Sequence, residues 1–250
     1  MRTLRASYRL LLLCLLTAIL TVIWLGRIPL LRAEKRNPWR GTMVGLWARN
    51  AIRILHIRIT VNGTPPAAPF FLVSNHLSYL DVILYQTQMP CVFVAKSEVA
   101  HWPVVGWLAR AIGTLFINRR SRRDVVRVNQ EIQQALTSGD GVILFPEGTS
   151  SKGETVLPFK SATLATVTNM GYPAYYASVT YKTPEGEPPA QQVICWWGDM
   201  TFADHVFNML KLPYFEATVT FGAGAVATTD RKEMAHLLNA RIVDSFVPVV

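Results

Sequence analysis

The amino-acid sequence predicts an α/β domain with a mostly parallel central sheet flanked by helices, preceded by an N-terminal membrane-associated helical segment. Three observations lead to this prediction. From residue 57 onward, short apolar runs alternate with helical patterns, as is typical of strand–helix–strand units. An uncharged, largely apolar run at residues 10–26 opens the chain. Half of the 250 residues are apolar and only 16% are charged, a composition that favours contact with a membrane.

The uncharged run at residues 10–26 is the first expected helix. At ~1.5 Å per residue it spans roughly 26 Å, slightly less than the ~30 Å hydrocarbon core of a bilayer. A secretory signal peptide has a similar pattern, but no small-x-small cleavage site follows here. We therefore expect a membrane anchor. Basic residues are denser after the run, which predicts a following domain on the cytoplasmic side of the inner (plasma) membrane. A re-entrant helix is the alternative at this length.

An amphipathic helix is expected next. Asn37-Pro38 resembles an N-cap followed by a proline at the first helical position. Apolar residues from Trp39 to Leu55 then recur near one side of the helix. Such a basic, tryptophan-containing helix can lie in a membrane interface, or its apolar side can pack on the rest of the protein. Residues 1–56 are thus predicted to form a membrane-facing segment, and residues 57–250 a single domain.

Strands and helices alternate through this domain. Apolar and polar residues alternate over 57–61, and residues 70–73 form a continuous apolar run, as expected for a half-exposed and a buried strand. Ser121 is a potential N-cap. The expected strands are 57–61, 70–73, 91–95, 114–117, 142–145, 173–181, 193–197 and 216–221. The expected helices are 78–87, 96–108, 121–135, 161–169, 202–210 and 229–246.

The segment after the strand at 70–73 contains a candidate catalytic pair, His76 and Asp81. In one ideal helix their side chains would point about 140° apart, so they converge only if His76 lies in the preceding loop and Asp81 in the first helical turn. Ser78 and Asp81 have the spacing of a capping box, which places Ser78 at the N-cap. A histidine oriented by a carboxylate is suited to accept a proton from a hydroxyl. Alternatively, Asp81 only closes the helix end and His76 has no role.

Further candidate residues follow neighbouring strands. Arg119 follows the strand at 114–117, and Glu147, Gly148 and Thr149 follow the strand at 142–145. An arginine can bind a phosphate or carboxylate, and a turn of small residues offers backbone N–H groups. The alternatives are a solvated basic turn at Arg119-Arg120 and an ordinary loop at Pro146-Glu147-Gly148. The excess of 25 basic over 16 acidic residues favours anionic partners. The three cysteines are far apart and match neither a zinc site nor a disulfide framework.

The order and spacing of these motifs resemble the lysophospholipid acyltransferase family, typified by 1-acylglycerol-3-phosphate acyltransferase. The segment from His76 to Asp81 matches the His-x4-Asp block of the family. Ala95-Lys96-Ser97-Glu98 matches its Ala-Lys-x-Glu segment. The second block is matched by residues 113–119, and the third by Phe145-Pro146-Glu147-Gly148-Thr149.

The resemblance implies that His76 is the general base on an acceptor hydroxyl and that Asp81 orients it. The chain lacks the Gly-x-Ser-x-Gly motif expected for an acyl-serine mechanism, so the attacking hydroxyl should belong to the substrate. The implied acyl donor is a fatty acyl thioester on CoA or acyl carrier protein, with no cofactor and no metal. The residues expected to bind the acceptor and its phosphate are Lys96, Arg119, Glu147, Gly148 and Thr149.

Two departures from the family pattern leave the acceptor open. Ser150 stands where the third block often has arginine, unless Lys152 replaces that charge, and Tyr176 stands at the place of a proline in the fourth block. The segment 196–200 is similar to a bacterial branch that includes lyso-ornithine lipid acyltransferases. The first expected acceptor is the sn-2 hydroxyl of 1-acyl-sn-glycerol 3-phosphate, giving phosphatidic acid. The alternative is lyso-ornithine lipid or another lysolipid.

A non-catalytic, membrane-tethered module that binds anionic lipids is the alternative from a different class. A binding module has no need of a His/Asp pair beside a helix start, which argues against it. Nucleic-acid binding is not expected, because the basic residues cluster in the N-terminal segment and no recognition motif occurs. The expected partners are therefore a lysophospholipid acceptor, acyl-CoA or acyl carrier protein, and membrane lipids.

Overall fold

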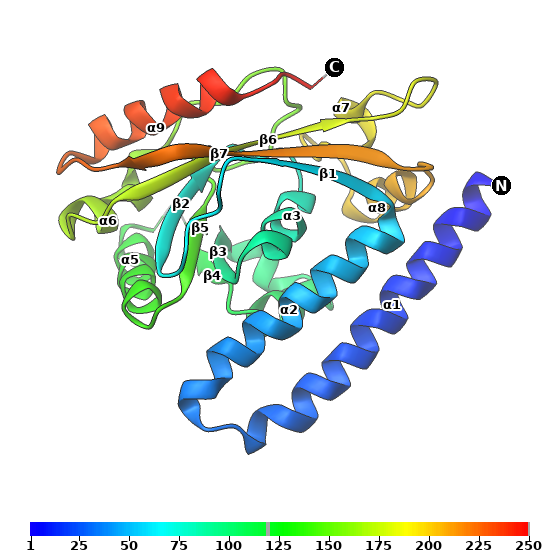
Figure 1. Ribbon diagram of the computed structural model, residues 1–250, viewed down its shortest axis with the longest axis horizontal. Coiled ribbons are helices and arrows are strands. Elements are labelled where there is room, and N and C mark those ends of the chain that lie inside the picture. Colours follow the sequence, from blue (N-terminus) through cyan, green and yellow to red (C-terminus); the bar gives the residue numbers. More distant parts are fainter. Residues whose placement is uncertain (119–120, 250) are drawn as a thin grey trace.

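A computed structural model describes residues 1–118 and 121–249, except for the side chain of Arg122. Within these residues a seven-stranded sheet forms the centre, in the order β1-β7-β6-β2-β5-β3-β4 (Figure 1). All neighbouring strands are parallel except β6 and β7, which are antiparallel. The predicted fold class is thus confirmed. The strands are β1 (Ile57–Asn62), β2 (Phe70–Ser74), β3 (Cys91–Lys96), β4 (Leu115–Ile117), β5 (Gly141–Leu144), β6 (Ala174–Lys182) and β7 (Phe215–Val226).

Helices cover both faces of the sheet. Strand β2 shows how the two layers divide: Phe70 and Leu72 pack in one layer, whereas Phe71 and Val73 pack in the other. All residues of β2 are buried, as expected for a central strand of a parallel sheet. The first layer contains α2 (Ala33–Leu55), α3 (Leu80–Gln88) and α8 (Phe202–Leu210). The second contains α5 (Arg122–Thr137), α6 (Ala165–Asn169) and α9 (Arg231–Ser245).

The parallel strands bring their carboxyl ends to one edge of the sheet. The short elements η2 (Ser97–His101) and α4 (Val105–Ala111) follow β3, and η3 (Ser161–Leu164) and α7 (Ala190–Val193) lie further along the chain. The loop after β2, the end of β3 and the loop after β5 all lie at this edge, where α/β sheets usually hold ligands. The sheet therefore gathers the predicted site residues of three strands.

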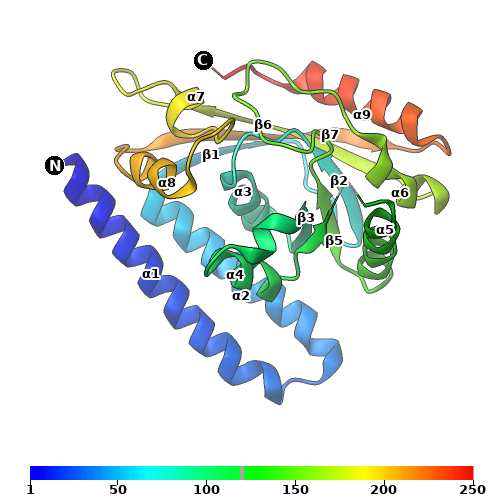
Figure 2. The same cartoon turned by 180° about the vertical axis from the view of Figure 1, so that it is seen from behind.

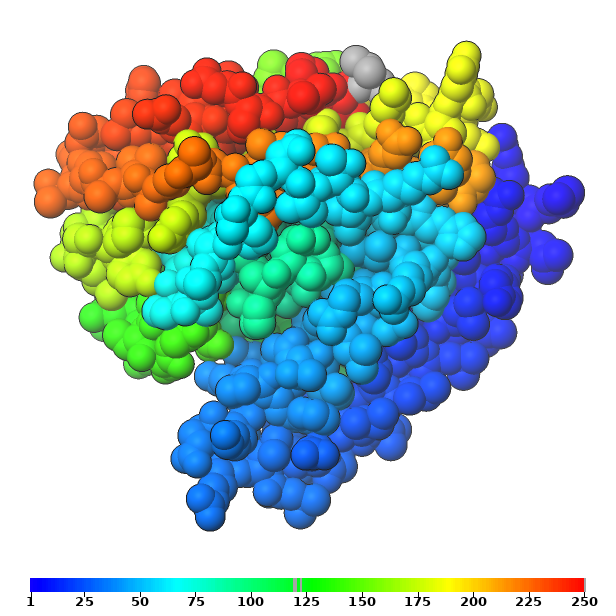
Figure 3. All heavy atoms as spheres, viewed as in Figure 1, coloured from blue at the N-terminus to red at the C-terminus, as the bar shows by residue number. Residues whose placement is uncertain are grey.

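Helix α1 (Arg2–Arg27) forms a hairpin with α2, which belongs to the first helix layer. The hairpin tip, formed by η1 (Ile28–Leu30) and the residues after it, projects away from the sheet (Figures 1 and 2). The space-filling view shows this tip extending below the body of the protein (Figure 3). Within the part of the chain that the structure describes, residues Arg2–Leu30 form the one helix long and apolar enough to cross a membrane.

The two faces of α1 differ. At its start, Arg5 donates a hydrogen bond to the carbonyl of Lys211 at 2.8 Å, and Arg9 donates to carbonyls at the end of α8, including that of Leu212 at 2.5 Å. These bonds fasten the inner face to the domain. The outer face presents a continuous stripe of exposed apolar side chains, spaced three or four residues apart: Leu4, Tyr8, Leu11, Leu15, Ile19 and Val22.

Helix α2 contacts α3 and α1, and Gly45, Ala48, Ala51 and Leu55 are its buried residues. These contacts correspond to the packing alternative of the sequence analysis. The predicted start at Asn37-Pro38 is wrong, because α2 begins at Ala33. The Asn37 side chain bonds to Asp140 instead of capping the helix, and the helix runs through Pro38.

The predicted strand at residues 193–197 is also wrong. Val193 ends α7, and the next residues form a turn: the N–H groups of Ile194 and Cys195 donate to the carbonyl of Ala190, and that of Trp196 donates to the carbonyl of Leu77. Ile194 and Cys195 are nevertheless fully buried. The apolar run at residues 193–197 therefore indicates that these residues are buried, and not that they form a strand.

Candidate active site

The structure brings His76 and Asp81 together at the carboxyl end of β2. His76 lies in the loop after the strand and Asp81 in the first turn of α3, with Nδ1 of His76 2.8 Å from Oδ2 of Asp81. A carboxylate only accepts hydrogen bonds, so Nδ1 carries the shared proton and Nε2 is left to accept one. The imidazole stacks on the Phe145 ring at 4.2 Å between centroids. This geometry is suited to general base catalysis.

Asp81 is fully buried, and four donors satisfy its carboxylate. Oδ2 accepts hydrogen bonds from the His76 ring and from the N–H groups of Leu77, at 2.8 Å, and Ser78, at 3.1 Å. Oδ1 accepts the hydroxyl of Tyr181 at 2.6 Å. Burial and the neighbouring Asp81 carboxylate raise the pKa of Tyr181 well above its ordinary value, so Tyr181 remains a donor.

Sequence reasoning missed Tyr181. It lies on β6, 100 residues after Asp81. No motif marks it, and only its place at the end of a predicted strand distinguishes it from other tyrosines. Its contact with Asp81 depends on β6 pairing beside β2, which is a property of the sheet order.

The predicted capping box at the start of α3 is half formed. The Asp81 carboxylate accepts the N–H of Ser78, as the motif requires. The N-cap, however, is Tyr79, and the Ser78 hydroxyl has no hydrogen-bond partner among the described residues. One carboxylate thus contacts the imidazole and also closes the helix end.

Asn75 anchors the loop on the other side of His76. Its Nδ2 donates to the carbonyl of Val179 at 2.9 Å, and its Oδ1 accepts the N–H of Val179 at 2.8 Å. Val179 and Tyr181 are two residues apart on β6 and therefore point to the same face of the sheet. Strand β6 thus holds the loop both before and after His76.

Glu147 also contacts the backbone of the loop that contains His76. Its Oε1 accepts the N–H of His76 at 2.7 Å and its Oε2 accepts the N–H of Leu157 at 3.1 Å. Burial raises the pKa of Glu147 to about 8, while the two N–H donors act in the opposite direction. Both oxygens are engaged with the backbone, and the contact with the acceptor that the resemblance implies stays a prediction. Its geometry is that of a residue that positions His76.

The other predicted acceptor-binding residues surround His76. Lys96 lies at the end of β3 with an exposed side chain, and Gly148 and Thr149 form the turn after β5, where Gly148 has a φ of +81°. These three residues line the same cavity as His76. Arg119 lies outside the described residues. The structure therefore brings Lys96, Gly148 and Thr149 to the candidate pair.

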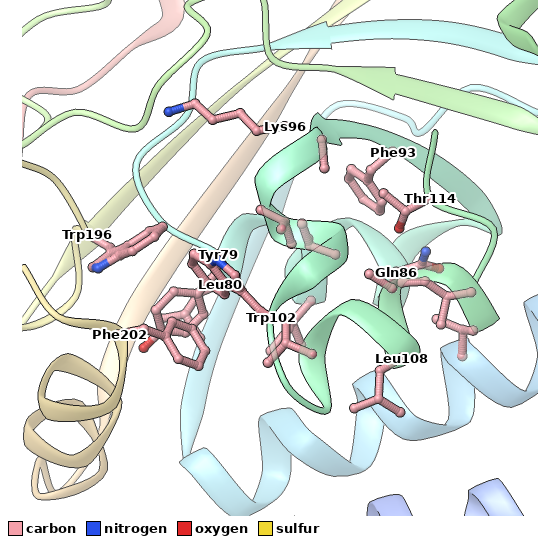
Figure 4. A pocket seen from close by; sticks show the side chains of 18 of the residues that line it. Tyr79, Leu80, Gln86, Phe93, Lys96, Trp102, Leu108, Thr114, Trp196 and Phe202 are labelled. Atoms are coloured by element: carbon pink, nitrogen blue, oxygen red, sulfur yellow. The ribbon is translucent and has the colours of Figure 1, made fainter. Parts of the chain in front are cut away.

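The cavity beside His76 has a volume of about 740 Å³ and predominantly apolar walls. Helices α1, α2, α3 and α4 contribute to it. Figure 4 shows an aromatic cluster at one end and a second group, including Phe93, Gln86 and Thr114, at the other. A cavity of this size and character can hold a hydrocarbon chain. The aromatic cluster consists of Tyr79, Trp102, Trp196 and Phe202.

The segment around Trp196 is tied to the two loops that form the site. Its N–H donates to the carbonyl of Leu77 at 2.8 Å, and its carbonyl accepts a hydrogen bond from the Ser150 hydroxyl. Its indole N–H donates to the carbonyl of Met200 at 2.9 Å. The aromatic wall of the cavity is therefore fixed relative to His76.

The chain is similar to known acyltransferases. A family model described as Acyltransferase matches residues 57–181. The chain is 36% identical over 180 residues to a lyso-ornithine lipid O-acyltransferase of Rhodobacter capsulatus, covering 70% of this chain and 64% of that protein. It is 30% identical over 204 residues to a 1-acyl-sn-glycerol-3-phosphate acyltransferase of Neisseria gonorrhoeae, covering 81% and 78%.

The fold is also found in a solved structure. The crystal structure of the 1-acyl-sn-glycerophosphate (LPA) acyltransferase PlsC from Thermotoga maritima matches with a TM-score of 0.70 at 21% identity, covering 98% of each chain. At this identity the match concerns the fold.

Proposed function

The chain belongs to the Acyltransferase family, and from this premise we propose that it is a membrane-associated enzyme that transfers a fatty acyl group from a thioester to the free hydroxyl of a lysolipid. The observation that carries the proposal is the position of the His76–Asp81 pair at the wall of an apolar cavity. The cavity provides space for acyl chains, and the pair provides a base for the hydroxyl.

In the proposed reaction, Nε2 of His76 takes the proton from the acceptor hydroxyl. The oxygen attacks the thioester carbonyl to form a tetrahedral intermediate, which collapses by breaking the carbon–sulfur bond. The leaving thiolate, of CoA or of an acyl carrier protein, takes the proton back from His76. Asp81 holds the ring through Nδ1 and stabilises the imidazolium between the two steps.

The first proposed acceptor is 1-acyl-sn-glycerol 3-phosphate, acylated at its sn-2 hydroxyl to give phosphatidic acid. Lys96 supports this choice, because an exposed cation on the cavity that contains His76 can pair with a phosphate. Arg119 is expected to supply a second cation. The name of the Neisseria relative also favours this acceptor.

Lyso-ornithine lipid is a second candidate, favoured by Ser150 and by the name of the Rhodobacter relative. At this position the family often has arginine, whereas the Ser150 hydroxyl bonds to the carbonyl of Trp196. The position therefore contributes no cation to the site. An ornithine head group carries a carboxylate and an amine, so it requires less positive charge than a phosphate.

The hairpin supports attachment to one leaflet of the membrane. A spanning α1 would have its two ends on opposite sides of the bilayer. Arg5 and Arg9, however, bond to the backbone of residues 210–213, which keeps the start of α1 beside the catalytic domain. We therefore favour the re-entrant alternative, with the domain on the cytoplasmic side of the inner membrane.

A side-by-side assay of the two acceptors tests this proposal. The purified full chain, in mixed micelles with one acyl thioester, is expected to acylate at least one of them. If Lys96 binds a phosphate, Lys96→Met raises the KM for 1-acylglycerol 3-phosphate more than that for lyso-ornithine lipid. An equal effect on both would exclude a phosphate-specific contact. Absence of acyl transfer to any lysolipid would contradict the proposed function.

A further inference from the structure

We infer that the loop of residues 102–107 inserts into the acyl region of a lipid leaflet, so that the cavity beside His76 opens between two membrane-inserted walls. Helix α1 is one wall and this loop is the other. The inference rests on the proposed attachment to a membrane and adds a second point of contact to it.

The outer side of the loop is apolar and exposed. No residue from Trp102 to Ala109 is charged. Val104 does not line the cavity, and 70% of its surface is exposed; Trp107 lines the cavity and is also 45% exposed. Exposed basic side chains, His101 and Arg110, flank this uncharged stretch. An apolar tip with a tryptophan and basic flanks matches the profile of a membrane interface, where cations meet lipid head groups and apolar groups reach the acyl chains.

The inner side of the loop belongs to the cavity. Trp102, Val105, Trp107 and Leu108 line it, as Figure 4 shows for Trp102 and Leu108. The Trp102 ring packs on Trp196 and Phe202, with centroid distances of 5.7 and 5.4 Å. The loop is therefore a fixed part of the cavity wall, and its outer side has a defined position relative to the site.

The backbone of the loop holds Val104 in a strained conformation. Val104 has φ +61° and ψ −56°, which a β-branched residue rarely adopts. The turn is tight: the N–H of Gly106 donates to Trp102 at 2.9 Å, and a Cβ at Gly106 would lie 2.3 Å from the carbonyl oxygen of Ala100. The strained backbone thus exposes an apolar side chain, and contact with water does not stabilise that arrangement.

The position of α1 indicates that a lipid leaflet contacts Val104. The inner face of α1 lines the same cavity as the loop, through residues such as Leu13 and Leu20, while its outer stripe is apolar and exposed. In the view of Figure 2, α4 is drawn in front of α2, with α1 to the left. Both walls of one cavity therefore present apolar outer surfaces. A lipid leaflet covers both at once, whereas an acidic carrier protein would require cations at the tip of the loop.

Site-specific labelling tests the insertion directly. The full chain carries Cys14→Ser and Val104→Cys, so that an environment-sensitive dye reacts at residue 104 while Cys91 and Cys195 remain buried. The probe membrane is a vesicle of phosphatidylcholine and phosphatidylglycerol at a ratio of about 3:1, with or without brominated acyl chains. We expect brominated lipids to quench the dye at residue 104. A dye at Val126→Cys, on the exposed side of α5, should remain unquenched. An unquenched dye at residue 104 on bound protein overturns the inference.

Activity gives an independent test. Val104→Glu should raise the apparent KM for a lysolipid in these vesicles roughly tenfold, while leaving turnover of a short-chain, monomeric lysolipid unchanged. Val104→Gly, which relieves the positive φ and preserves the fold, should act in the same direction, and Val126→Glu should have no effect. An equal loss of activity on the vesicle-bound and the monomeric lysolipid would identify the loop as a lid over the cavity and overturn the inference. Unchanged kinetics would also overturn the inference, and a protein partner would then explain the exposed apolar surface of the loop. If the wild type acylates no lysolipid, the proposed function fails, but the quenching result still reports on the loop.

Discussion

Hydrogen bonds to its backbone and to its ring hold His76 in position. Asn75, the residue before His76, is hydrogen-bonded to β6. Glu147 accepts the N–H of His76, and the carbonyl of His76 accepts the N–H of Ser151 at 3.0 Å. Asp81 holds the ring. A base that is fixed before the substrate arrives spends no binding energy on orientation, which is how positioned groups accelerate a reaction. The contribution of the surrounding residues can therefore be measured one contact at a time.

Tyr181→Phe removes one donor from the buried Asp81 carboxylate. This bond fixes the carboxylate that orients the imidazole, so its loss should misplace the base and lower kcat roughly tenfold. The carboxylate, less neutralised, holds the imidazolium proton more strongly, and the acidic limb of the pH–rate profile should move to higher pH. The matched control is Tyr85→Phe, because the hydroxyl of Tyr85 bonds to Ser74 and not to Asp81. Identical pH profiles for the two variants would show that Tyr181 has only a structural role.

Glu147 makes the stability of the fold depend on pH. Its pKa is about 8 in the folded chain, against a usual value of 4.5. Between these values the folded state holds a proton that the unfolded state releases, so the stabilisation is complete below the lower value and is lost as pH rises through about 8. The free energy of unfolding should therefore decrease from pH 5 to pH 8, and less so in Glu147→Gln. Urea titrations of both proteins in detergent check this, and parallel pH curves would contradict it.

At the scale of elements, the contact between α1 and α8 determines how the hairpin is held. Arg9 is buried and donates to the carbonyls of Leu210, Leu212 and Pro213 at 3.2, 2.5 and 2.9 Å. These carbonyls lie at the end of α8, where no helical N–H groups remain to satisfy them. The arginine thus completes the end of α8 and fastens α1 to the domain.

Arg9→Met should loosen α1 without unfolding the sheet. It leaves buried carbonyls without donors, at a cost of about 1–3 kcal/mol each. In detergent we expect faster amide hydrogen exchange over α1 and the end of α8, and unchanged exchange in β2 and β5. Arg2→Met is the matched control, since Arg2 makes an exposed ion pair with Glu187. Exchange that is unchanged in α1 would refute the role of this contact.

At the scale of the whole molecule, local patterns in the sequence predict most of the fold. The strand at residues 70–73 and the helix at 202–210 follow from continuous apolar and amphipathic patterns, and His76 and Asp81 converge as the loop-and-helix argument requires. The N-cap at Ser121 is also confirmed, since its hydroxyl accepts the N–H of Asp124. Each of these features depends on residues close together in the chain.

Features that depend on distant segments could not be predicted in this way. Tyr181 reaches Asp81 because β6 lies beside β2, and no local pattern specifies that order. The segment 193–197 has the composition of a strand, yet the backbone of Trp196 bonds to the loop that contains His76. Glu147 accepts the N–H of His76, a contact that depends on β5 lying beside β2. In each case contacts between segments far apart in the chain decide the structure.

The central claim is that His76 is the base in acyl transfer to a lysolipid hydroxyl, and the turnover of His76→Ala tests it most directly. Removal of the base should lower kcat by about 10²–10⁴-fold. The purified variant should retain the far-UV circular dichroism and the thermal midpoint of the wild type. His236→Ala, which changes an exposed histidine on α9, should retain full activity. A folded His76→Ala enzyme with turnover close to that of the wild type would contradict the claim.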